Sequence, residues 1–450
     1  MNYPAWDVPL IGGGLLIGLI AILHVFVAHF AVGGGLFLVW TEARAYRKND
    51  AALLGYVRRH SSFFVLLVLV FGAVSGVGIW WSIGLVHPPA TSALIHTFVW
   101  GWAIEWVFFF VEIAAAFVYY YGWDRLDRRA HLAIGWIYFG AAWLSLFVIN
   151  GILTFMLTPG RWLVTGTFAD GFFNPTMVPS AVIRTASAVA LAGLYALVTA
   201  SRVGDDALRH RVTRYAAGWI LAGALVFPLA GPWYISLIPS AAREISMGGA
   251  AAVTIFAGMS IMLSALIVAI AFLGPFRRPD FSNPLLVGVM VVLGLGVTGV
   301  TEWVREAVRK PYIIYGYMYS NGIRVQEVSA LSQTGVLPVA KWASVTDAGG
   351  GQELKAGAEL FRIECRSCHT LDGYNAIRPL VKGWREEFTD YQLQRLNELK
   401  GFMPPFVGSP PERRALARWL AEVGGSGPFS MPAPQSRVRN ESAGAEEVAR

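Results

Sequence analysis

The stretch IGGGLLIGLIAILHVFVAHFAVGGGLFLVWT at residues 11–41 decides the fold of this chain. It contains no Lys, Arg, Asp or Glu, and it exceeds the roughly 20 residues that a helix needs to cross a bilayer. No basic stretch precedes it, and no small-residue cleavage site follows it. We therefore expect a retained membrane helix and not a cleaved signal peptide.

The rest of the chain repeats this apolar pattern. Hydrophobic residues make up 55% of the 450 residues and charged residues only 14%, which excludes a soluble enzyme. Pro228 and Pro232 should kink or break one of the later apolar runs. The sequence predicts an all-α fold, a polytopic membrane helix bundle of about eight transmembrane helices with a small C-terminal domain. The further runs lie at residues 62–86, 93–121, 132–157, 179–200, 215–238, 248–274 and 284–305.

The net charge of +7 comes from short loops between the apolar runs. From residue 321 onward, 16 Lys/Arg face 15 Asp/Glu, so no nucleic-acid partner is expected. Alternate loops are basic, whereas the N-terminus and the intervening loops carry only Arg161 and Arg243 outside the helices. The positive-inside rule makes the basic loops cytoplasmic, so we expect a bacterial inner membrane protein with both termini in the periplasm. The basic loops contain Arg44, Arg47, Lys48, Arg58, Arg59, Arg125, Arg128, Arg129, Arg202, Arg209, Arg211, Arg214, Arg277 and Arg278.

Both cysteines of the chain lie in one motif, Cys365-Arg366-Ser367-Cys368-His369. This is the C-x-x-C-H pattern in which Cys365 and Cys368 attach a haem covalently and His369 supplies an axial nitrogen to the iron. A redox dithiol or half of a zinc site would need a thioredoxin-like context or a second ligand pair, and the sequence has neither. We expect one covalent haem c, which in bacteria is attached outside the cytoplasm.

The second axial ligand should lie downstream, on a loop that can fold back over the iron. Met403 stands in GFMPPF, where two prolines prevent a helix from continuing, and it is our candidate. Met431 lies in a Ser/Pro/Gly-rich tail and is a poor competitor. Together these residues resemble a class I monohaem cytochrome c over residues 353–423.

The chain should thus divide into four parts. We expect a transmembrane bundle at residues 1–320, a linker at 321–352, a periplasmic cytochrome c domain at 353–424 and a disordered tail at 425–450.

Several ionisable residues fall at membrane depth, where they are costly and become functional candidates by default. His60, His131 and His210 fall in cytoplasmic loops, where we expect ordinary solvated histidines. The alternative for the membrane group is that its members only hydrogen-bond to one another in the bundle interior. The membrane group comprises His24, His29, His96, Glu105, Glu112, Arg184, Glu302, Arg305, Glu306 and Arg309.

Two of these helices suggest a haem site with a proton route. At 1.5 Å per residue, His24 and Glu105 should lie at a similar depth in the outer half of the bilayer. Glu105 and Glu112 are seven residues apart and share one helix face. His24 or a carboxylate could ligate iron near the outside, and Glu112 could relay protons from deeper in the bundle. His29 points elsewhere, and it is either a second site or a structural histidine.

Three stretches resemble cytochrome bd quinol oxidase subunit I over residues 1–316. Leu23-His24-Val25-Phe26-Val27, followed by Thr41-Glu42 and a basic loop, is similar to its first helix. Glu112 followed by Gly122-Trp123-Asp124-Arg125-Leu126 is similar to its third helix. Arg305-Glu306-Ala307-Val308-Arg309-Lys310-Pro311-Tyr312 resembles its E-x-G-R-Q-P-W signature, with three replacements.

The resemblance implies one or two non-covalent haems of b or related type. It implies His24 and Glu306 as axial ligands, Glu105 and Glu112 as the acidic pair beside the haems, and Arg309 as a propionate or quinol-side contact.

Two departures from the family matter. Arg184 stands where the family has the His ligand of its low-spin haem, so that haem should be altered or missing. Only about ten residues, Pro239 to Gly248, replace the long loop that binds quinol in the family. We therefore do not expect ordinary quinol oxidation, and haem c is the natural replacement for that electron donor.

Three functions remain open. The chain could be an electron-transfer subunit of a respiratory oxidoreductase complex, passing electrons between bundle haems and haem c. It could be a bd-type terminal oxidase or gas reductase fed by cytochrome c. It could also be a haem-free membrane anchor for cytochrome c. The first two imply a second membrane subunit and a periplasmic redox partner protein.

Overall fold

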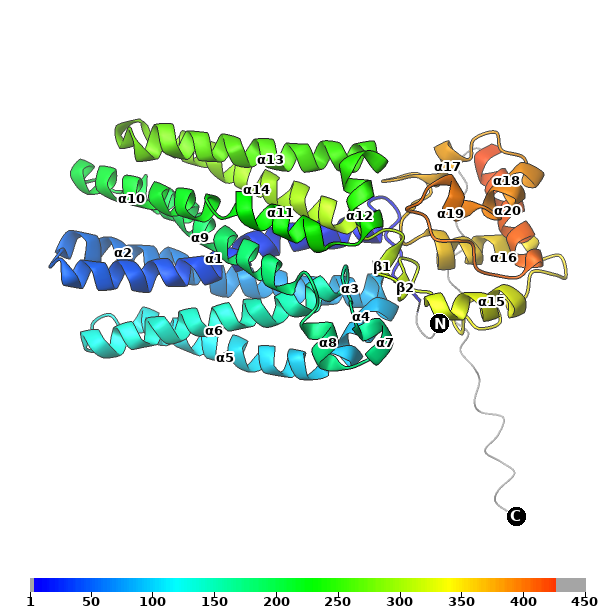
Figure 1. The fold of residues 1–450 in the computed structure, drawn as a ribbon, viewed down its shortest axis with the longest axis horizontal. Helices are drawn as coiled ribbons and strands as arrows, with labels where there is room; N and C mark the ends of the chain where they lie inside the picture. The colour runs from blue at the N-terminus through cyan, green and yellow to red at the C-terminus, as the bar shows by residue number, and fades with distance from the viewer. Residues whose placement is uncertain (1–3, 426–450) are drawn as a thin grey trace, which may run out of the picture. The chain divides into compact units, whose positions relative to one another are not determined.

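The computed structural model describes residues 4–425, and these residues form two compact units (Figure 1). The larger, which we call the bundle unit, comprises Leu16–Ile83 and Thr91–Tyr315. The smaller, which we call the small unit, comprises residues 4–15, Gly84–Ala90 and residues 316–425. The predicted tail at 425–450 lies outside the described residues except for Gly425.

The bundle unit is helical almost throughout. Its short segments are η1 (Leu66–Gly72), α7 (Trp162–Thr165), α8 (Phe168–Phe172), α12 (Ser240–Glu244), η2 (Ile245–Gly249), η3 (Phe272–Phe276), η4 (Pro279–Phe281) and β1 (Tyr312–Ile314). The longer helices are α1 (Gly13–Arg47), α2 (Ala51–Val65), α3 (Ala73–Val86), α4 (Pro88–Thr97), α5 (Val99–Tyr121), α6 (Arg128–Phe155), α9 (Met177–Ala200), α10 (Asp206–Ala224), α11 (Phe227–Leu237), α13 (Ala251–Ala271) and α14 (Pro284–Ala307).

Eight helical spans are long and apolar enough to cross a membrane within the described residues, which confirms the predicted number. They are α1, the continuous run Ala51–Val86, α5, α6, α9, the run Asp206–Leu237, the run Ala251–Phe276 and α14. The helices extend further into the basic connections than the apolar runs suggested. His60 and His131 therefore lie in α2 and α6 and not in loops, and His96 lies in α4, before the third span.

Polar residues cap the helices that begin next to the basic connections. The side chains of Asp50, Asp127, Asp205 and Asn283 each accept a backbone N–H from the first turn of α2, α6, α10 or α14. These caps satisfy amide groups that the helix itself leaves without partners. The capped ends therefore explain why the spans start where they do.

The prolines break the sixth span as expected. α10 ends at Ala224 and α11 begins at Phe227, with Pro228 in its first turn and Pro232 inside it. The backbone amides of Leu225 and Val226 still donate to carbonyls of the preceding turn. Both amides therefore keep a hydrogen-bond partner at the interruption, as backbone groups inside a membrane require.

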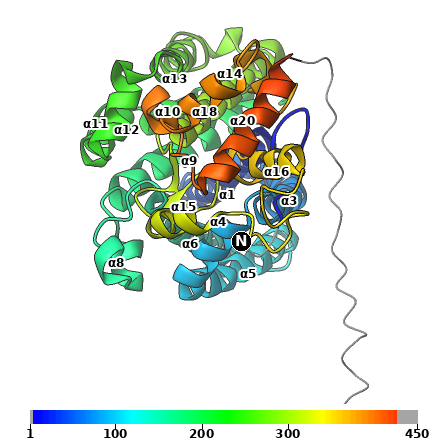
Figure 2. The same ribbon diagram turned by 90° about the vertical axis from the view of Figure 1, so that its right-hand side faces the viewer.

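In the bundle unit α5 lies beside α6 and α13 beside α14 (Figure 1 and Figure 2). Small residues hold neighbouring spans close together. A Cβ atom at Gly193 of α9 would lie 2.4 Å from the carbonyl oxygen of Ala216 in α10. A Cβ at Gly33 of α1 would lie 1.9 Å from the carbonyl oxygen of Ala188 in α9. Such close backbone contact is a common way for helices to associate in lipid, where hydrophobic burial gives no net attraction.

The small unit is built around two crossing helices. Its elements are β2 (Met318–Tyr319), η5 (Val325–Glu327), α15 (Val328–Thr334), α16 (Glu353–Leu360), η6 (Phe361–Cys365), α17 (Ile377–Leu380), α18 (Glu386–Leu393), α19 (Leu396–Leu399) and α20 (Pro410–Gly425). α16 packs across α20, where a Cβ at Gly357 would lie 2.3 Å from the carbonyl oxygen of Ala415. Phe361 and Trp419 pack together in the buried core, with ring centroids 5.0 Å apart.

The segment that we predicted to be a linker, residues 321–352, contributes to this core. It forms α15, and its buried residues include Val336, Leu337 and Val345. The buried Glu412 side chain binds this segment through the amides of Val336 and Leu337, at 2.8 to 3.0 Å. Because a buried carboxylate needs such donors, Glu412 fixes the segment against α20.

We expect the Gly193→Ala variant to be less stable than the wild type by about 1–3 kcal/mol, because the added methyl overpacks the α9–α10 contact. Thermal unfolding in detergent would measure this difference. Gly140→Ala in α6 is the matched control, since its Cβ would meet nothing within 4 Å. Equal stability of the two variants would contradict the close packing of α9 on α10.

Candidate haem sites

The C-x-x-C-H motif forms one helical turn in the small unit. The amides of Cys368 and His369 both donate to the carbonyl of Cys365, at 3.1 and 2.9 Å. The motif begins at the end of η6, on the segment that joins α16 to α17, both of which are labelled in Figure 1. The turn brings the two thiols and the imidazole into one short segment, as covalent attachment of a single haem requires.

His369 is oriented for iron ligation. Its Nδ1 lies 3.0 Å from the backbone carbonyl oxygen of Asn375, so Nδ1–H donates there and leaves the lone pair of Nε2 available. Burial lowers the pKa of His369, which keeps the imidazole neutral at neutral pH. The side-chain amide of Asn375 in turn donates to the carbonyl of Cys368 at 2.7 Å. These residues fit a haem c.

Other residues of the small unit support the motif. Arg366 forms an ion pair with Asp7, and the carbonyl of Leu10 accepts the amide of Tyr374 at 2.8 Å. The buried Glu364 accepts the amide of Val407 at 2.9 Å. Val407 lies four residues beyond Met403, so this bond anchors one end of the loop that carries the candidate second ligand. Met403 itself is half-buried, and its role as a ligand stays a prediction.

In the bundle unit, His24 lies on α1 and faces α3. Its Nδ1 lies 3.1 Å from the hydroxyl of Ser75, and its ring would contact a Cβ at Gly76. His29 is buried, and its Nδ1 donates to the carbonyl of Val25 at 2.8 Å, which leaves Nε2 unprotonated. Both imidazoles can therefore offer a nitrogen lone pair to iron.

The predicted acidic pair lies on α5 and faces α6. The hydroxyl of Ser145 donates to Glu105 at 3.0 Å, and the hydroxyl of Tyr138 donates to the buried Glu112 at 3.0 Å. Among the described residues no hydrogen bond or ion pair joins His24 to either carboxylate. The predicted common depth of His24 and Glu105 therefore stays a prediction.

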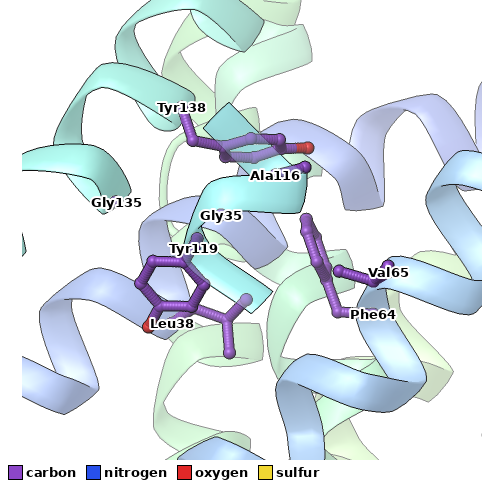
Figure 3. Close-up of a pocket in the computed structure, with 8 residues that line it drawn as sticks. All are labelled: Gly35, Leu38, Phe64, Val65, Ala116, Tyr119, Gly135 and Tyr138. Carbon is purple, nitrogen blue, oxygen red and sulfur yellow. The ribbon is translucent and has the colours of Figure 1, made fainter. Parts of the chain in front are cut away.

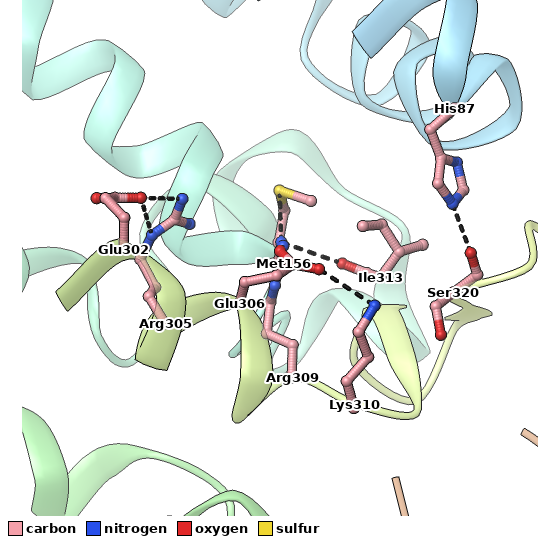
Figure 4. A network of polar contacts seen from close by, with 9 residues as sticks. All are labelled: His87, Met156, Glu302, Arg305, Glu306, Arg309, Lys310, Ile313 and Ser320. Carbon is pink, nitrogen blue, oxygen red and sulfur yellow. Dashed lines mark hydrogen bonds and ion pairs between the residues drawn. The ribbon is translucent and has the colours of Figure 1, made fainter. Parts of the chain in front are cut away.

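The two Glu-x-x-Arg pairs near the end of α14 differ in burial (Figure 4). Arg305 donates twice to Glu302, at 2.9 and 2.6 Å, and the Glu302 side chain is only 12% exposed. Glu306 pairs with Arg309 and with Lys310, and its side chain is 42% exposed. The predicted ligand Glu306 is thus the more open of the two carboxylates.

No group of three or more His, Cys, Asp or Glu side chains in residues 4–425 is placed to hold a metal ion by itself. A haem iron takes only its axial ligands from the protein, so isolated histidines and carboxylates are the relevant candidates.

We did not predict from the sequence a buried polar cluster that lies at the end of the bundle unit near the basic connections. The carboxylate of Glu42 accepts the hydroxyl of Tyr119 at 2.7 Å and lies 2.7 Å from Nδ1 of His131. Nε2 of His131 donates to the carbonyl of Tyr119 at 2.9 Å. His131 is only 2% exposed, so our expectation of a solvated loop histidine was wrong. The helical continuation of α6 past the basic residues, set by the Asp127 cap, places it inside.

A small cavity separates this cluster from Glu112. Its volume is about 10 Å³, near the minimum for one water, and Tyr119 and Tyr138 both line it (Figure 3). Tyr138 in turn donates to Glu112. The tyrosine that bonds Glu42 and the tyrosine that bonds Glu112 therefore line the same cavity.

His60 is a further buried histidine of the bundle unit. It is fully buried and surrounded by aromatic rings, and its Nδ1 lies 2.9 Å from the hydroxyl of Thr199. The expectation of a solvated histidine was wrong here as well, because α2 begins at Ala51 and carries His60 into the apolar interior.

The fold and these sites define a membrane haem protein of electron-transfer or oxidase type. Residues 15–237 match the family model of cytochrome bd terminal oxidase subunit I. Residues 352–420 match that of the cytochrome c oxidase, cbb3-type, subunit III. Over these ranges the chain is similar to a cytochrome bd subunit I membrane domain followed by a cytochrome c domain. The C-x-x-C-H motif of the second range fits a covalent haem c.

A solved structure supports the fold. The bd oxidase from Geobacillus thermodenitrificans is similar with a TM-score of 0.56 and 20% identity, over 68% of this chain and 88% of that chain. No curated protein matches the chain. The family model ends before α14, so the roles predicted for Glu306 and Arg309 stay predictions.

We expect Met403→Ala to abolish the methionine-to-iron charge-transfer band of the oxidised protein. It should also lower the haem c potential by on the order of 0.1 V, because a thioether ligand stabilises the reduced iron. Optical redox titration would measure both effects. Met431→Ala is the control and should leave the band unchanged. A band that survives in Met403→Ala would show that another residue is the ligand.

Proposed function

We propose that this chain is a membrane-bound cytochrome b/c electron-transfer subunit of a respiratory oxidoreductase complex. The observation that carries the proposal is the presence in one chain of a haem c site, with His369 oriented by Asn375, and of bundle histidines with available ring nitrogens. Haem supplies a one-electron carrier when bound at either site. Electrons would pass between the bundle and the periplasmic cytochrome c domain.

The residues of the bundle would hold non-covalent haem of b or related type. His24 would supply an axial nitrogen, with its ring steered by Ser75, and Glu306 would supply a carboxylate in a second site. Both assignments rest on the resemblance to the family and on the positions of these side chains. Lipid surrounds the bundle, and a second membrane subunit and a periplasmic redox protein are the proposed partners.

The orientation of the chain follows from its charges. We propose that the capped, Arg-rich ends of the spans face the cytoplasm and that both termini face the periplasm. Covalent haem attachment in the periplasm requires the same orientation. The two arguments are independent, since one uses the loops and the other uses the cysteine motif.

The first experiment is a reduced-minus-oxidised spectrum of the purified protein with and without carbon monoxide, combined with extraction of the haems. We expect haem c together with at least one non-covalent haem. A non-covalent haem that binds no carbon monoxide supports the electron-transfer subunit. Haem c alone would overturn the proposal and leave only the membrane anchor.

His24→Ala tests the bundle site directly. We expect the variant to lose one non-covalent haem per chain, because the remaining Ser75 hydroxyl cannot replace an imidazole nitrogen. The pyridine haemochrome assay would count the haems, and the haem c content should stay unchanged. The control is His96→Ala, an exposed histidine in α4. Unchanged non-covalent haem in His24→Ala would exclude that residue as a ligand.

A second candidate, a terminal oxidase or gas reductase fed by cytochrome c, is favoured by one observation. Two hydrogen-bonded groups of protonatable side chains meet at one small cavity in the bundle. The first comprises Glu42, His131 and Tyr119, and the second comprises Tyr138 and Glu112. Both ring nitrogens of His131 face acceptors, so the Glu42–His131 pair holds two exchangeable protons whether it is neutral or ionic. Oxygen reduction consumes protons, whereas simple electron transfer does not need such groups.

If the oxidase reading holds, we expect Glu42→Gln to lower oxygen consumption at least about 10-fold while haem content stays unchanged, because proton delivery is interrupted. An oxygen electrode with a reduced soluble donor would measure the rate. Asp124→Asn, which changes an exposed carboxylate paired with Arg58, is the control. Equal rates in the two variants would remove the proton route from the argument.

A further inference from the structure

A second cavity lies inside the bundle unit, where α6, α9, α11 and α14 meet. Its volume is about 20 Å³, which is space for one water-sized particle. Three arginines line it, namely Arg184 from α9, Arg305 from α14 and Arg309 from the turn after α14. The other lining residues are Leu153, Thr154, Leu157, Ser180 and Tyr234.

The guanidinium groups around this cavity have N–H donors to spare. Arg184 makes no hydrogen bond or ion pair with any other residue in the described part of the chain, and its Nε is buried. Arg309 is only 3% exposed, and its Nη atoms bond to Glu306, Met156 and the carbonyl of Ile313, but its buried Nε has no partner in residues 4–425. Figure 4 shows the Arg305 and Arg309 side chains with the partners that they do have.

The cavity wall offers donors but few acceptors. The hydroxyl of Ser180 donates to Oδ1 of Asn150 at 2.6 Å, and the hydroxyl of Thr154 donates to the carbonyl of Asn150 at 2.8 Å. The hydroxyl of Tyr234 makes no hydrogen bond with other described residues and remains able to donate. The complement of such a wall is a hydrogen-bond acceptor.

The charges around the cavity do not balance. Three arginines line the cavity, and two of them are paired, Arg305 with Glu302 and Arg309 with Glu306. The charge of the third, Arg184, has no ion-pair partner in the described part of the chain, which leaves one positive charge in excess. The nearby His29 donates its Nδ1–H to a carbonyl and cannot supply negative charge. Excess positive charge at membrane depth is costly. A bound water would leave that charge unchanged, whereas a bound anion would offset it.

We propose that this cavity binds a free monatomic anion of the size of chloride, held by Arg184, by Nε of Arg309 and by the hydroxyl of Tyr234. The size of the cavity selects against polyatomic anions such as phosphate. The anion would offset the charge of the arginine that occupies α9. The proposal does not depend on the proposed function, because it concerns stability and not turnover.

The test uses the purified, haem-loaded full chain in detergent. Thermal unfolding is followed as sodium chloride replaces sodium gluconate at constant ionic strength. We expect a saturable rise in unfolding temperature of at least about 3 °C, because an anion that binds only the folded state stabilises it. Bromide should replace chloride and be visible by anomalous scattering at the cavity.

Variants locate the effect. Arg184→Met should weaken chloride binding at least about tenfold, since it removes a charged donor, while Arg184→Lys should retain part of the affinity. Arg161→Met is the control, because that arginine is exposed and lies outside the cavity. Tyr234→Phe serves as a milder second test in case Arg184→Met does not fold.

Three results would overturn the proposal. A chloride effect that is not saturable, or that is equal in the wild type, Arg184→Met and Tyr234→Phe, would mean that the cavity holds water. A chloride effect that appears only after removal of the non-covalent haem would assign the negative charge to a haem propionate. A protein that lacks non-covalent haem but keeps the chloride effect would contradict the proposed function and would leave the anion site supported.

Discussion

Polar groups within lipid must be satisfied inside the protein, and the rest of this structure depends on that constraint. The hydroxyls of Tyr138 and Ser145 donate hydrogen bonds to the carboxylates of Glu112 and Glu105. The imidazole of His131 is hydrogen-bonded to Glu42. Each bond links two different helices, so it fixes their rotation as well as their separation. The polar pairs therefore determine which helix faces meet, while glycines such as Gly193 determine how closely they approach.

The small unit satisfies its buried acids in another way. Glu364 and Glu412 both accept backbone amides from loop segments, and neither is paired with a base among the described residues. An acid bonded to amides holds a loop in place without adding a second charge near the haem. In this way Glu364 holds the loop beyond Met403, and Glu412 holds the segment before α16.

Patterns that are local in sequence allowed the fold and one site to be predicted. The eight apolar runs give the eight spans, and the C-x-x-C-H motif gives the haem c site, because each depends on residues within a single segment. Partners from distant segments could not be inferred. The bond between Glu42 and His131 joins residues 89 apart, and the contacts of Val336 with Glu412 join residues 76 apart. The roles of His24, Glu105, Glu112, Glu306 and Arg309 still rest on the family resemblance.

Arg184 shows how a single side chain can change what one end of a bundle binds. A guanidinium stays protonated and has no lone pair for iron, so it cannot act as an axial ligand as a histidine would. It brings instead a positive charge that forms no ion pair with Glu302 or Glu306, since each carboxylate already bonds another arginine. With arginine at this position of α9, the cavity between α9 and α14 attracts negative charge and no longer offers a nitrogen to a metal. Haem c is the carrier for which the described residues provide both the cysteines for covalent attachment and an oriented axial histidine.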